Sequence, residues 1–267
     1  MEPRLAILAG SGALPQVLAS GDPQAVFVSF AGVDVAVPDG LTHLPASFEK
    51  LGALFQGLLD LSVTEVVFAG SMVRPALNPS EFDMKMTALA PRLMAAMGQG
   101  DDALLREVAA VFEEEGFAVK AAHEVAPMLL LPADTHIGPP PDKQDVADAQ
   151  KGLDILTTLA PMDVSQAAVV AGGQVLGIET VQGTDAMLAY VAQTPAHLRR
   201  AKGVLVKGPK QGQDMRFDVP TIGVGTVRNA AKAGLAGIYI AAGGVNVLER
   251  DAVEQALKDT GLFLHAR

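Results

Sequence analysis

The chain has 267 residues, of which 49% are apolar and 19% charged, so it can bury a sizeable core and is not a disordered chain. Its 20 Lys and Arg residues and 30 Asp and Glu residues give a formal net charge of −10, without a basic stripe that would indicate a nucleic-acid partner. There are no cysteines and the five histidines are scattered, which excludes disulfides and iron–sulfur clusters and disfavours zinc, whereas an oxygen-ligated Mg²⁺ or Mn²⁺ remains compatible.

Nothing in the sequence indicates export or a membrane span. The residues before the first strand-like run do not resemble a signal peptide, and no apolar run reaches the roughly 18 residues that a bilayer-spanning helix needs. We therefore expect a cytoplasmic protein.

The first half of the chain predicts strands that alternate with helices. Apolar strand-like runs lie at residues 5–9, 25–30 and 66–69, and apolar residues recur at helical spacing in residues 51–61 and after residue 101. Such alternation predicts a parallel sheet with helices on both faces.

A proline-rich stretch interrupts this pattern and predicts a domain boundary. Residues 139–141 are three consecutive prolines, which fit neither a helix interior nor a central strand. We predict an N-terminal nucleotide-binding domain (1–132), a linker (133–145) and a C-terminal domain (146–267). The second half contains a hairpin signal at Gly172-Gly173 among further strands and helices, so the whole chain is expected to be a two-domain α/β protein whose C-terminal sheet is mixed.

Glycine-rich turns follow two of the predicted strands in the first half. Gly10-Ser11-Gly12 follows residues 5–9, and Pro15 stands where a dinucleotide fingerprint needs a small residue, which leaves either a turn that binds a phosphate or nucleobase or merely a tight turn. Gly70 follows the strand at residues 66–69. Because the carboxyl ends of parallel strands meet at one edge of a sheet, the two turns are expected to converge there.

Charged residues accompany these turns. Arg74 would supply a charge for a phosphate, and its alternative role is a surface arginine with structural hydrogen bonds. Asp101 and Asp102 would hold a ribose or a base, or simply cap the helix that they begin.

The densest group of polar residues lies at residues 207–226, where glycines and prolines exclude a helix. If residues 213–219 are extended, Asp214, Arg216 and Asp218 project on one face, because side chains alternate along a strand. Two carboxylates beside a cation suit a metal ion and a phosphoryl oxygen together. The alternative is a structural cluster of ion pairs on an irregular loop.

A smaller group of residues with oxygen-bearing side chains precedes this stretch. Glu179, Thr184 and Asp185 are candidates to complete an oxygen-ligand shell with Asp214 and Asp218. Thr184 and Asp185 are also suited to cap the next helix, so both interpretations stay open.

Several of these motifs occur together in one known family. They lie at residues 9–15, 69–75, 101–106, 163–166, 183–185 and 210–226, and the last of them is the longest and most specific. On these residues the chain resembles the metal-dependent, two-domain UDP-2,3-diacylglucosamine pyrophosphatases of lipid A biosynthesis, which are unrelated to the calcineurin-like phosphoesterases. The resemblance covers nearly the whole length.

The resemblance implies hydrolysis of UDP-2,3-diacylglucosamine to UMP and 2,3-diacylglucosamine 1-phosphate (lipid X), with Mg²⁺ or Mn²⁺ as the cofactor. It implies that the N-terminal half holds the uridine nucleotide and the C-terminal half the acylated sugar phosphate. A homodimer is expected, and the acyl chains of the substrate imply transient contact of this peripheral protein with the cytoplasmic face of the inner membrane.

The resemblance also assigns roles to individual residues. The metal ion is expected on Asp214 and Asp218 with Glu179 or Asp185, and phosphoryl charge is expected to be stabilised by Lys207, Lys210 and Arg216. The substrate-binding residues expected are Ser11, Gly12, Ala13, Leu14, Gly70, Ser71, Arg74, Asp101, Asp102, Gln166, Thr184, Lys207, Gln213, Thr221 and Thr226.

Two positions depart from the family pattern. The pattern has an acidic residue just before the final threonine of the last motif, where this chain has Gly225, and a glutamate where it has Gln182. If the acid at position 225 is a metal ligand, this chain binds its substrate but turns it over poorly. An inactive form of the hydrolase that still binds substrate or product, whether natural or engineered, is therefore an alternative.

Three other functions remain as alternatives. A sugar-nucleotide transferase would share the ligands but need an acceptor. A nicotinamide oxidoreductase would need the glycine fingerprint that Pro15 spoils, and a non-enzymatic lipid-binding protein would show no dependence on a divalent ion.

Overall fold

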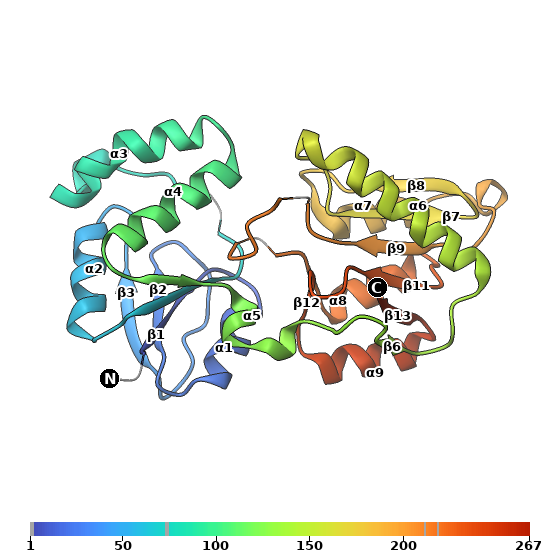
Figure 1. Ribbon diagram of the computed structural model, residues 1–267, viewed down its shortest axis with the longest axis horizontal. Coiled ribbons are helices and arrows are strands. Elements are labelled where there is room, and N and C mark those ends of the chain that lie inside the picture. The colour runs from blue at the N-terminus through green and yellow to red at the C-terminus, as the bar shows by residue number, and fades with distance from the viewer. Residues whose placement is uncertain (1–2, 73–74, 211, 218) are drawn as a thin grey trace. The chain divides into compact units, whose positions relative to one another are not determined.

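The computed structural model describes residues 3–72, 75–210, 212–217 and 219–267 of the chain, and the side chains of residues 101 and 102 are outside this description (Figure 1). The chain forms two compact units. Unit 1 contains Met1–Pro127 together with Arg216–Asp218, and unit 2 contains Met128–Met215 and Val219–Arg267. Unit 1 is thus built from two stretches of chain that are far apart in sequence.

Unit 1 is a parallel sheet with helices on both faces, as the alternating pattern predicts. Its strand order is β3-β2-β1-β4-β5, and each neighbouring pair is parallel. The strands are β1 (Leu5–Ala9), β2 (Val26–Phe30), β3 (Thr42–Ala46), β4 (Glu65–Ala69) and β5 (Ala118–Lys120). The helices are α1 (Leu14–Gly21), α2 (Leu51–Asp60), α3 (Met84–Met97), α4 (Asp101–Glu114) and α5 (Ala122–Val125), with a 3-10 turn at Pro79–Glu81. A further 3-10 turn, Pro127–Leu129, begins at the last residue of this stretch of unit 1 and continues into unit 2.

The central strand of this sheet is buried on both sides. Ala6 and Leu8 of β1 belong to a core cluster that also contains residues of α2, α3 and α4, whereas Ile7 points to the opposite face and is equally buried. An unbroken apolar run is typical of a strand covered on both faces, which explains why residues 5–9 show no alternation of polar and apolar residues.

Unit 2 has a mixed six-stranded sheet of order β6-β13-β11-β9-β7-β8. Strands β9, β11 and β13 are parallel, while β7 runs antiparallel to β8 and β9, and β6 antiparallel to β13. These strands are β6 (His136–Ile137), β7 (Ala167–Ala171), β8 (Gln174–Ile178), β9 (Val204–Lys207), β11 (Gly237–Ile240) and β13 (Phe263–Ala266). A separate parallel pair joins β10 (Thr221–Ile222) to β12 (Asn246–Val247).

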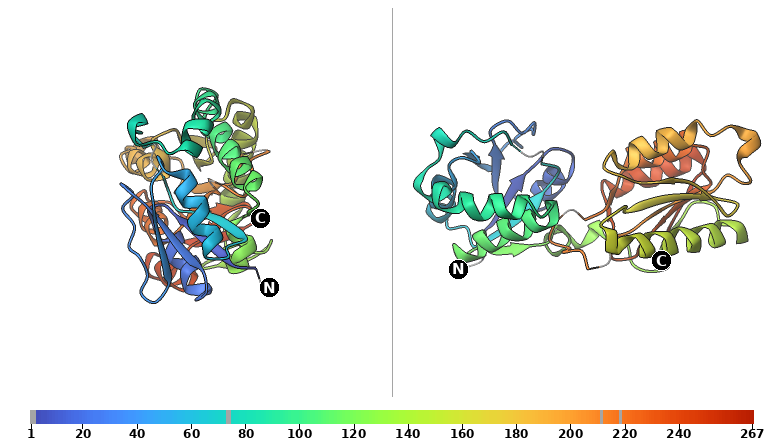
Figure 2. Two further views of the ribbon diagram at one scale, coloured as in Figure 1. Left: turned by 90° about the vertical axis from the view of Figure 1, so that its left-hand side faces the viewer. Right: turned by 90° about the horizontal axis from the view of Figure 1, so that it is seen from above.

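Helices cover both faces of the mixed sheet (Figure 2). They are α6 (Lys143–Leu159), α7 (Gly183–Ala192), α8 (Val224–Lys232) and α9 (Arg250–Thr260), with 3-10 turns at Ala160–Met162 and Ala196–Leu198. Helix α6 packs alone on one face, where Ala149 and Leu156 contact Val204 and Val206. The other three helices share a larger core cluster on the opposite face.

The fold class expected from the sequence is confirmed, including the mixed sheet and the hairpin at Gly172-Gly173. Residues 133–145, for which we predict a linker, contain strand β6 and the start of helix α6. In the part of the chain that the structure describes, no helix combines the length and apolar character required to cross a bilayer.

Two histidines face each other at the β6–β13 end of the sheet. His136 and His265 are register partners, their ring centroids are 5.7 Å apart, and Tyr239 packs edge-on to His265 at 5.2 Å. Burial lowers the pKa of His265, and the neighbouring His136 and Arg267 lower it further, whereas Asp134 acts in the opposite direction. The folded protein therefore takes up a proton on His265 at lower pH than the unfolded chain does.

This difference predicts how stability depends on pH. The stabilising contribution of neutral His265 is present above the ordinary histidine pKa of about 6.5 and is lost as the pH falls through the lowered pKa of the folded state. We expect the Tm of the unchanged protein to fall more than that of His265→Gln when the buffer is changed from neutral to mildly acidic pH. The exposed His197 provides the control, and parallel curves for the unchanged and His265→Gln proteins would contradict the prediction.

Candidate functional site

In unit 1 the turns after β1 and β4 converge, as the two glycine-terminated strands predict. The amide of Ser11 donates to the carbonyl of Ser71 at 2.8 Å, and the amide of Ser71 donates back to the carbonyl of Ser11 at 2.9 Å. The backbones are so close that a Cβ on Gly10 would lie 2.5 Å from the Ser71 carbonyl oxygen, and one on Gly70 would collide with the Ser11 carbonyl oxygen. Only glycine fits at these two positions.

The point where these two turns meet, which we call the glycine crossing, lies where the strand order reverses. From β1 the chain turns to β2 on one side and later returns to β4 on the other. In open parallel sheets, ligands bind at the carboxyl ends of the strands at such a point. Helix α1 begins there, its N-cap residue Ala13 makes no side-chain cap, and Gly12 has the left-handed φ of +99°. The residues expected at the nucleotide, Ser11 to Leu14 with Gly70 and Ser71, therefore share one edge of the sheet.

Three other residues expected at the nucleotide lie wholly or partly outside the described part of the structure. Arg74 lies outside the described residues. Asp101 and Asp102 form the first turn of α4, as predicted, but only their backbone is described. Their contact with a ribose or base remains a prediction.

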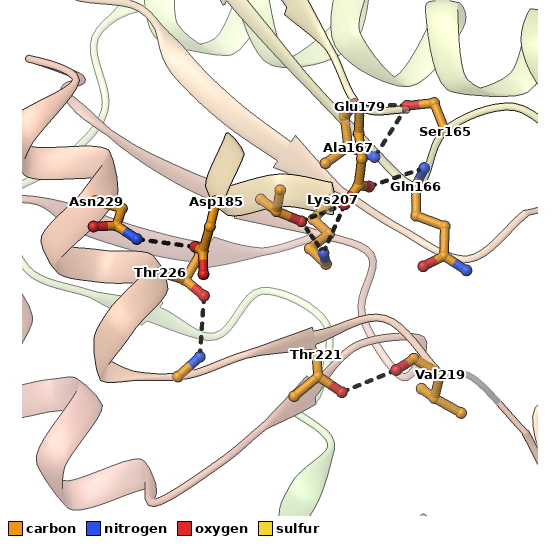
Figure 3. Close-up of polar contacts among 12 residues, drawn as sticks. Ser165, Gln166, Ala167, Glu179, Asp185, Lys207, Val219, Thr221, Thr226 and Asn229 are labelled. Carbon is orange, nitrogen blue, oxygen red and sulfur yellow. Dashed lines mark hydrogen bonds and ion pairs between the residues drawn. The ribbon is translucent and has the colours of Figure 1, made fainter. Parts of the chain in front are cut away.

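In unit 2 the site is built around the buried ammonium group of Lys207, the last residue of β9 (Figure 3). The Lys207 side chain is 7% exposed, and its Nζ donates to Thr184 Oγ1 at 2.5 Å. Thr184 Oγ1 in turn donates to Glu179 Oε1 at 2.5 Å, which lies 3.8 Å from the ammonium nitrogen. The charge is thus balanced by a carboxylate that is itself 12% exposed.

Further hydrogen bonds connect this buried pair to two loops. Glu179 Oε2 accepts from the backbone amide of Gln166 at 3.2 Å. The Gln166 side chain donates to Gln213 Oε1 at 3.0 Å, and the same oxygen accepts from the backbone amide of Lys210 at 3.0 Å. The Lys210 ammonium group lies 2.7 Å from Asp163 Oδ1 on the surface. The residues before β7 and after β9 therefore form one hydrogen-bonded network.

Two helix N-termini lie beside this network. Strands β8 and β9 both run antiparallel to β7, so their carboxyl ends, with Glu179 and Lys207, share one edge of the sheet. Asp185 in the first turn of α7 accepts from Asn229 of α8 at 2.9 Å (Figure 3), and Thr226 in the first turn of α8 accepts from the amide of Gly223 at 3.4 Å. The partial positive charge of the two helix starts favours an anion at this edge.

Gly225 is the second residue of α8 and is exposed. A Cβ built on it would meet no atom within 4 Å, and its φ does not lie in the left-handed region. The position therefore accepts an aspartate without a steric clash.

The described acidic residues do not gather into a metal site. No group of three or more His, Asp or Glu residues among them lies close enough together to hold an ion. Both carboxylate oxygens of Glu179 are engaged by Thr184 and Gln166, and one oxygen of Asp185 is engaged by Asn229. Asp218 lies outside the described residues, so the expected set of metal ligands remains a prediction.

A shared face for Asp214 and Arg216 requires an extended conformation, and the described residues of 213–219 do not adopt one. The chain turns at residues 215 and 216, and Phe217 is buried in the core of unit 1, where Arg216 bonds to Glu113 at 2.6 Å. Packing of one phenylalanine has overridden the alternation on which the prediction rested. Thr221 follows in β10 and donates to the carbonyl of Val219 at 2.9 Å.

Two residues at the site had no role assigned from the sequence: Asp163, which lies in the motif at residues 163–166, and Asn229. Asp163 pairs with Lys210 and has a left-handed φ of 57°, and nearby Ser165 has a φ of 72°. Non-glycine residues in this conformation are uncommon and concentrate at functional sites. The polar stretch at residues 163–166 was a usable signal, whereas Asn229 inside a helix gave none.

Comparisons with known proteins match the whole chain. A model of the LpxI N-terminal domain matches residues 4–129, and a model of the LpxI C-terminal domain matches residues 132–265. The chain is also 40% identical over 270 residues to the UDP-2,3-diacylglucosamine pyrophosphatase LpxI of Caulobacter vibrioides, an alignment that covers 98% of this chain and 96% of that protein.

The buried Lys207–Glu179 pair predicts a non-additive effect on stability. Lys207→Met leaves the buried Glu179 carboxylate without its counter-charge, and Glu179→Gln leaves the buried Lys207 ammonium group without its own. We expect each single change to lower the free energy of unfolding by about 3 kcal/mol. The double variant should lose less than the sum by about 1–2 kcal/mol, measured by urea unfolding. The more exposed Lys210–Asp163 pair is the control, for which we expect a coupling below about 1 kcal/mol. Additive losses at Lys207 and Glu179 would contradict the buried network.

Proposed function

This chain belongs to the LpxI family, and we propose that it hydrolyses the pyrophosphate bond of UDP-2,3-diacylglucosamine to give UMP and 2,3-diacylglucosamine 1-phosphate in lipid A biosynthesis. The observation that carries this proposal is the 40% identity to a pyrophosphatase of that name along almost the whole of both chains. The chain is accordingly a hydrolase of a phosphoric anhydride.

Unit 1 is proposed to bind the uridine nucleotide. The support is the glycine crossing at the reversal of strand order, together with the uncapped start of α1. Backbone amides at a helix start suit a phosphate, and the absence of a Cβ on Gly10 and Gly70 lets the two turns meet at that point.

Unit 2 is proposed to bind the acylated sugar phosphate and the phosphoryl charge. Lys207 and Lys210, with the first turns of α7 and α8, supply positive charge at one edge of the sheet. In the reaction, water adds to one phosphorus, the bond from that phosphorus to the bridging oxygen breaks, and the proton of water is released. Stabilisation of the charge that develops on the phosphoryl oxygens is the main contribution that such residues make.

Arg216 is less suited to this role. Its described contact is with Glu113 of unit 1, so direct contact of its guanidinium group with the reacting phosphate remains a prediction. Gln166 and Gln213 are proposed to position the loop beside Lys210 rather than to carry charge.

A divalent ion, Mg²⁺ or Mn²⁺, is proposed as the cofactor. Mg²⁺ is commonly bound through one or two carboxylates together with substrate phosphates and keeps several waters, so it does not require three protein acids. Asp185 and Asp214 are the described carboxylates that we propose for this contact. Glu179 fits the ion pair with Lys207 better than it fits a metal, because both of its oxygens are engaged.

We also propose a homodimer in the cytoplasm that makes transient contact with the cytoplasmic face of the inner membrane. The homodimer is what the family resemblance implies, and the reason for the membrane contact is chemical, since both the substrate and the acylated product carry acyl chains that partition into a bilayer. Sedimentation with and without vesicles that contain the substrate would test both parts.

The proposed function predicts release of UMP in the absence of any acceptor. In ¹⁸O-water with Mg²⁺, the chain should convert UDP-2,3-diacylglucosamine to UMP and the sugar 1-phosphate, and label on UMP would identify attack at the α-phosphorus. Chelation with EDTA should abolish the release, and added Mg²⁺ should restore it. Turnover that requires an acceptor would favour a transferase, and an unchanged rate after chelation would remove the metal from the proposal.

Gly225 predicts a gain of activity by a single substitution. If the position takes part in the chemistry, Gly225→Asp should raise turnover by about 10²-fold. Stability should not fall, because there is open space at the position and an acid in the first turn of a helix contributes about 0.3–1 kcal/mol. Gly225→Asn is the matched control, and equal rates for the two variants would show that a carboxylate at position 225 is not catalytic.

A further inference from the structure

The short segment Arg216–Asp218 belongs to unit 1, although the residues on either side of it belong to unit 2. Phe217 is 5% exposed and lies in the core cluster of unit 1. Its ring centroid is 5.2 Å from that of Phe68 on β4, in an edge-on arrangement. Phe68 makes the same kind of contact with Phe112 of α4 at 5.4 Å. Phe217 is therefore a full member of a phenylalanine cluster whose other members come from residues 55–117.

Arg216 is attached to the same unit as Phe217. Its guanidinium group lies 2.6 Å from Glu113 in the last turn of α4, and its central carbon lies 5.4 Å from the centroid of the Phe217 ring. The two consecutive residues thus hold the chain by burial of an aromatic ring and by an ion pair.

The beginning of the same loop is fixed to unit 2. The amide of Gly208 donates to the carbonyl of Gln166 at 3.0 Å, and Gln213 accepts from both the Gln166 side chain and the Lys210 amide. Only Asp214 and Met215 lie between these contacts and Arg216. In the described part of residues 208–220 there is no helix or strand, so side-chain contacts such as these contribute to the conformation of the loop in place of a backbone hydrogen-bond ladder.

We propose that Phe217 is a positioning residue for the reaction: by its burial in unit 1 it fixes the far end of the loop that presents Lys210, Gln213 and Asp214. The inference rests on the function proposed above for these three residues. A loop without secondary structure loses conformational entropy when it is ordered, and one buried aromatic ring limits how many conformations remain. Removal of the ring should therefore take away the buried anchor at the far end of the loop and leave the partly exposed Arg216–Glu113 ion pair there.

Phe112 offers a matched control for this proposal. It is 3% exposed, contacts the same Phe68 ring edge-on, and lies in a helix rather than in the loop. Phe112→Leu and Phe217→Leu each remove one ring from the same core, and only the second change is made in the loop itself. Both should be made in the unchanged protein and in the Gly225→Asp background, so that turnover is measured on the more active form.

The experiment compares three measurements on the full chain: Tm, cleavage by trypsin after Arg216, and kcat and KM for UDP-2,3-diacylglucosamine. For Phe217→Leu we expect cleavage about tenfold faster, because the bond between residues 216 and 217 is freed. We expect kcat to fall about tenfold, because displacement of a positioning group by about 1 Å is costly. Phe112→Leu should lower Tm similarly but change the other two within about twofold.

The outcomes separate this inference from the function on which it rests. Equal losses of kcat for the Phe112 and Phe217 variants would show that Phe217 only fills the core. Faster trypsin cleavage of Phe217→Leu with an unchanged kcat would show that the position of the loop does not matter to the reaction. Either result would overturn the proposal. If UMP binds but no form turns the substrate over, the proposed function fails, and cleavage after Arg216 still decides whether Phe217 anchors the loop. Should the Phe217→Leu and Phe112→Leu variants both fail to fold, the smaller volume changes Phe217→Met and Phe112→Met replace them, and Phe217→Met must accelerate that cleavage more than Phe112→Met does if Phe217 anchors the loop.

Discussion

The buried ammonium group of Lys207 is the constraint around which the site of unit 2 is organised. A charge taken out of water at the end of a strand needs a counter-charge and hydrogen-bond acceptors. Thr184 and Glu179 supply both, and they thereby place the start of α7 and the residue after β8 beside the end of β9. Because Glu179 also accepts from the Gln166 amide, the positions of three loops follow from the burial of one cation.

The same balance of charge decides which groups are free to act on an anion. Lys207 is largely compensated by Glu179, so its contribution to an approaching phosphate is reduced. Lys210 is different, since its partner Asp163 is 74% exposed and such surface pairs contribute little to stability. A phosphate therefore competes easily with Asp163 for Lys210. The first turns of α7 and α8 add a positive potential that comes from the backbone and not from a charged side chain. This edge of unit 2 is therefore suited to a phosphoryl group.

The sequence predicted what depends on local pattern and failed where long-range packing decides. Periodicity was sufficient for the parallel sheet of unit 1, and the rule that parallel strands end at one edge was sufficient for the meeting of Gly10 with Gly70. The conformation around Arg216 was not predictable, because Phe217 and Arg216 contact Phe68 and Glu113, which lie more than a hundred residues earlier in the chain. Glu179 illustrates a chemical limit: a carboxylate suits a metal and a lysine equally, and only its neighbours in space distinguish the two.

At Gly225 the attraction of an anion to this edge and the proposed chemistry there would have separate physical origins. The first turn of α8 attracts an anion through its backbone amides, which are present whatever side chain occupies the position. A carboxylate at position 225 would contribute no packing, since its Cβ would touch nothing, and the bond from the Gly223 amide to Thr226 does not involve it. The fold therefore places no demand on this residue. An acid at position 225 would therefore matter to the proposed reaction rather than to the stability of the fold, which depends on buried contacts such as that of Lys207 with Thr184.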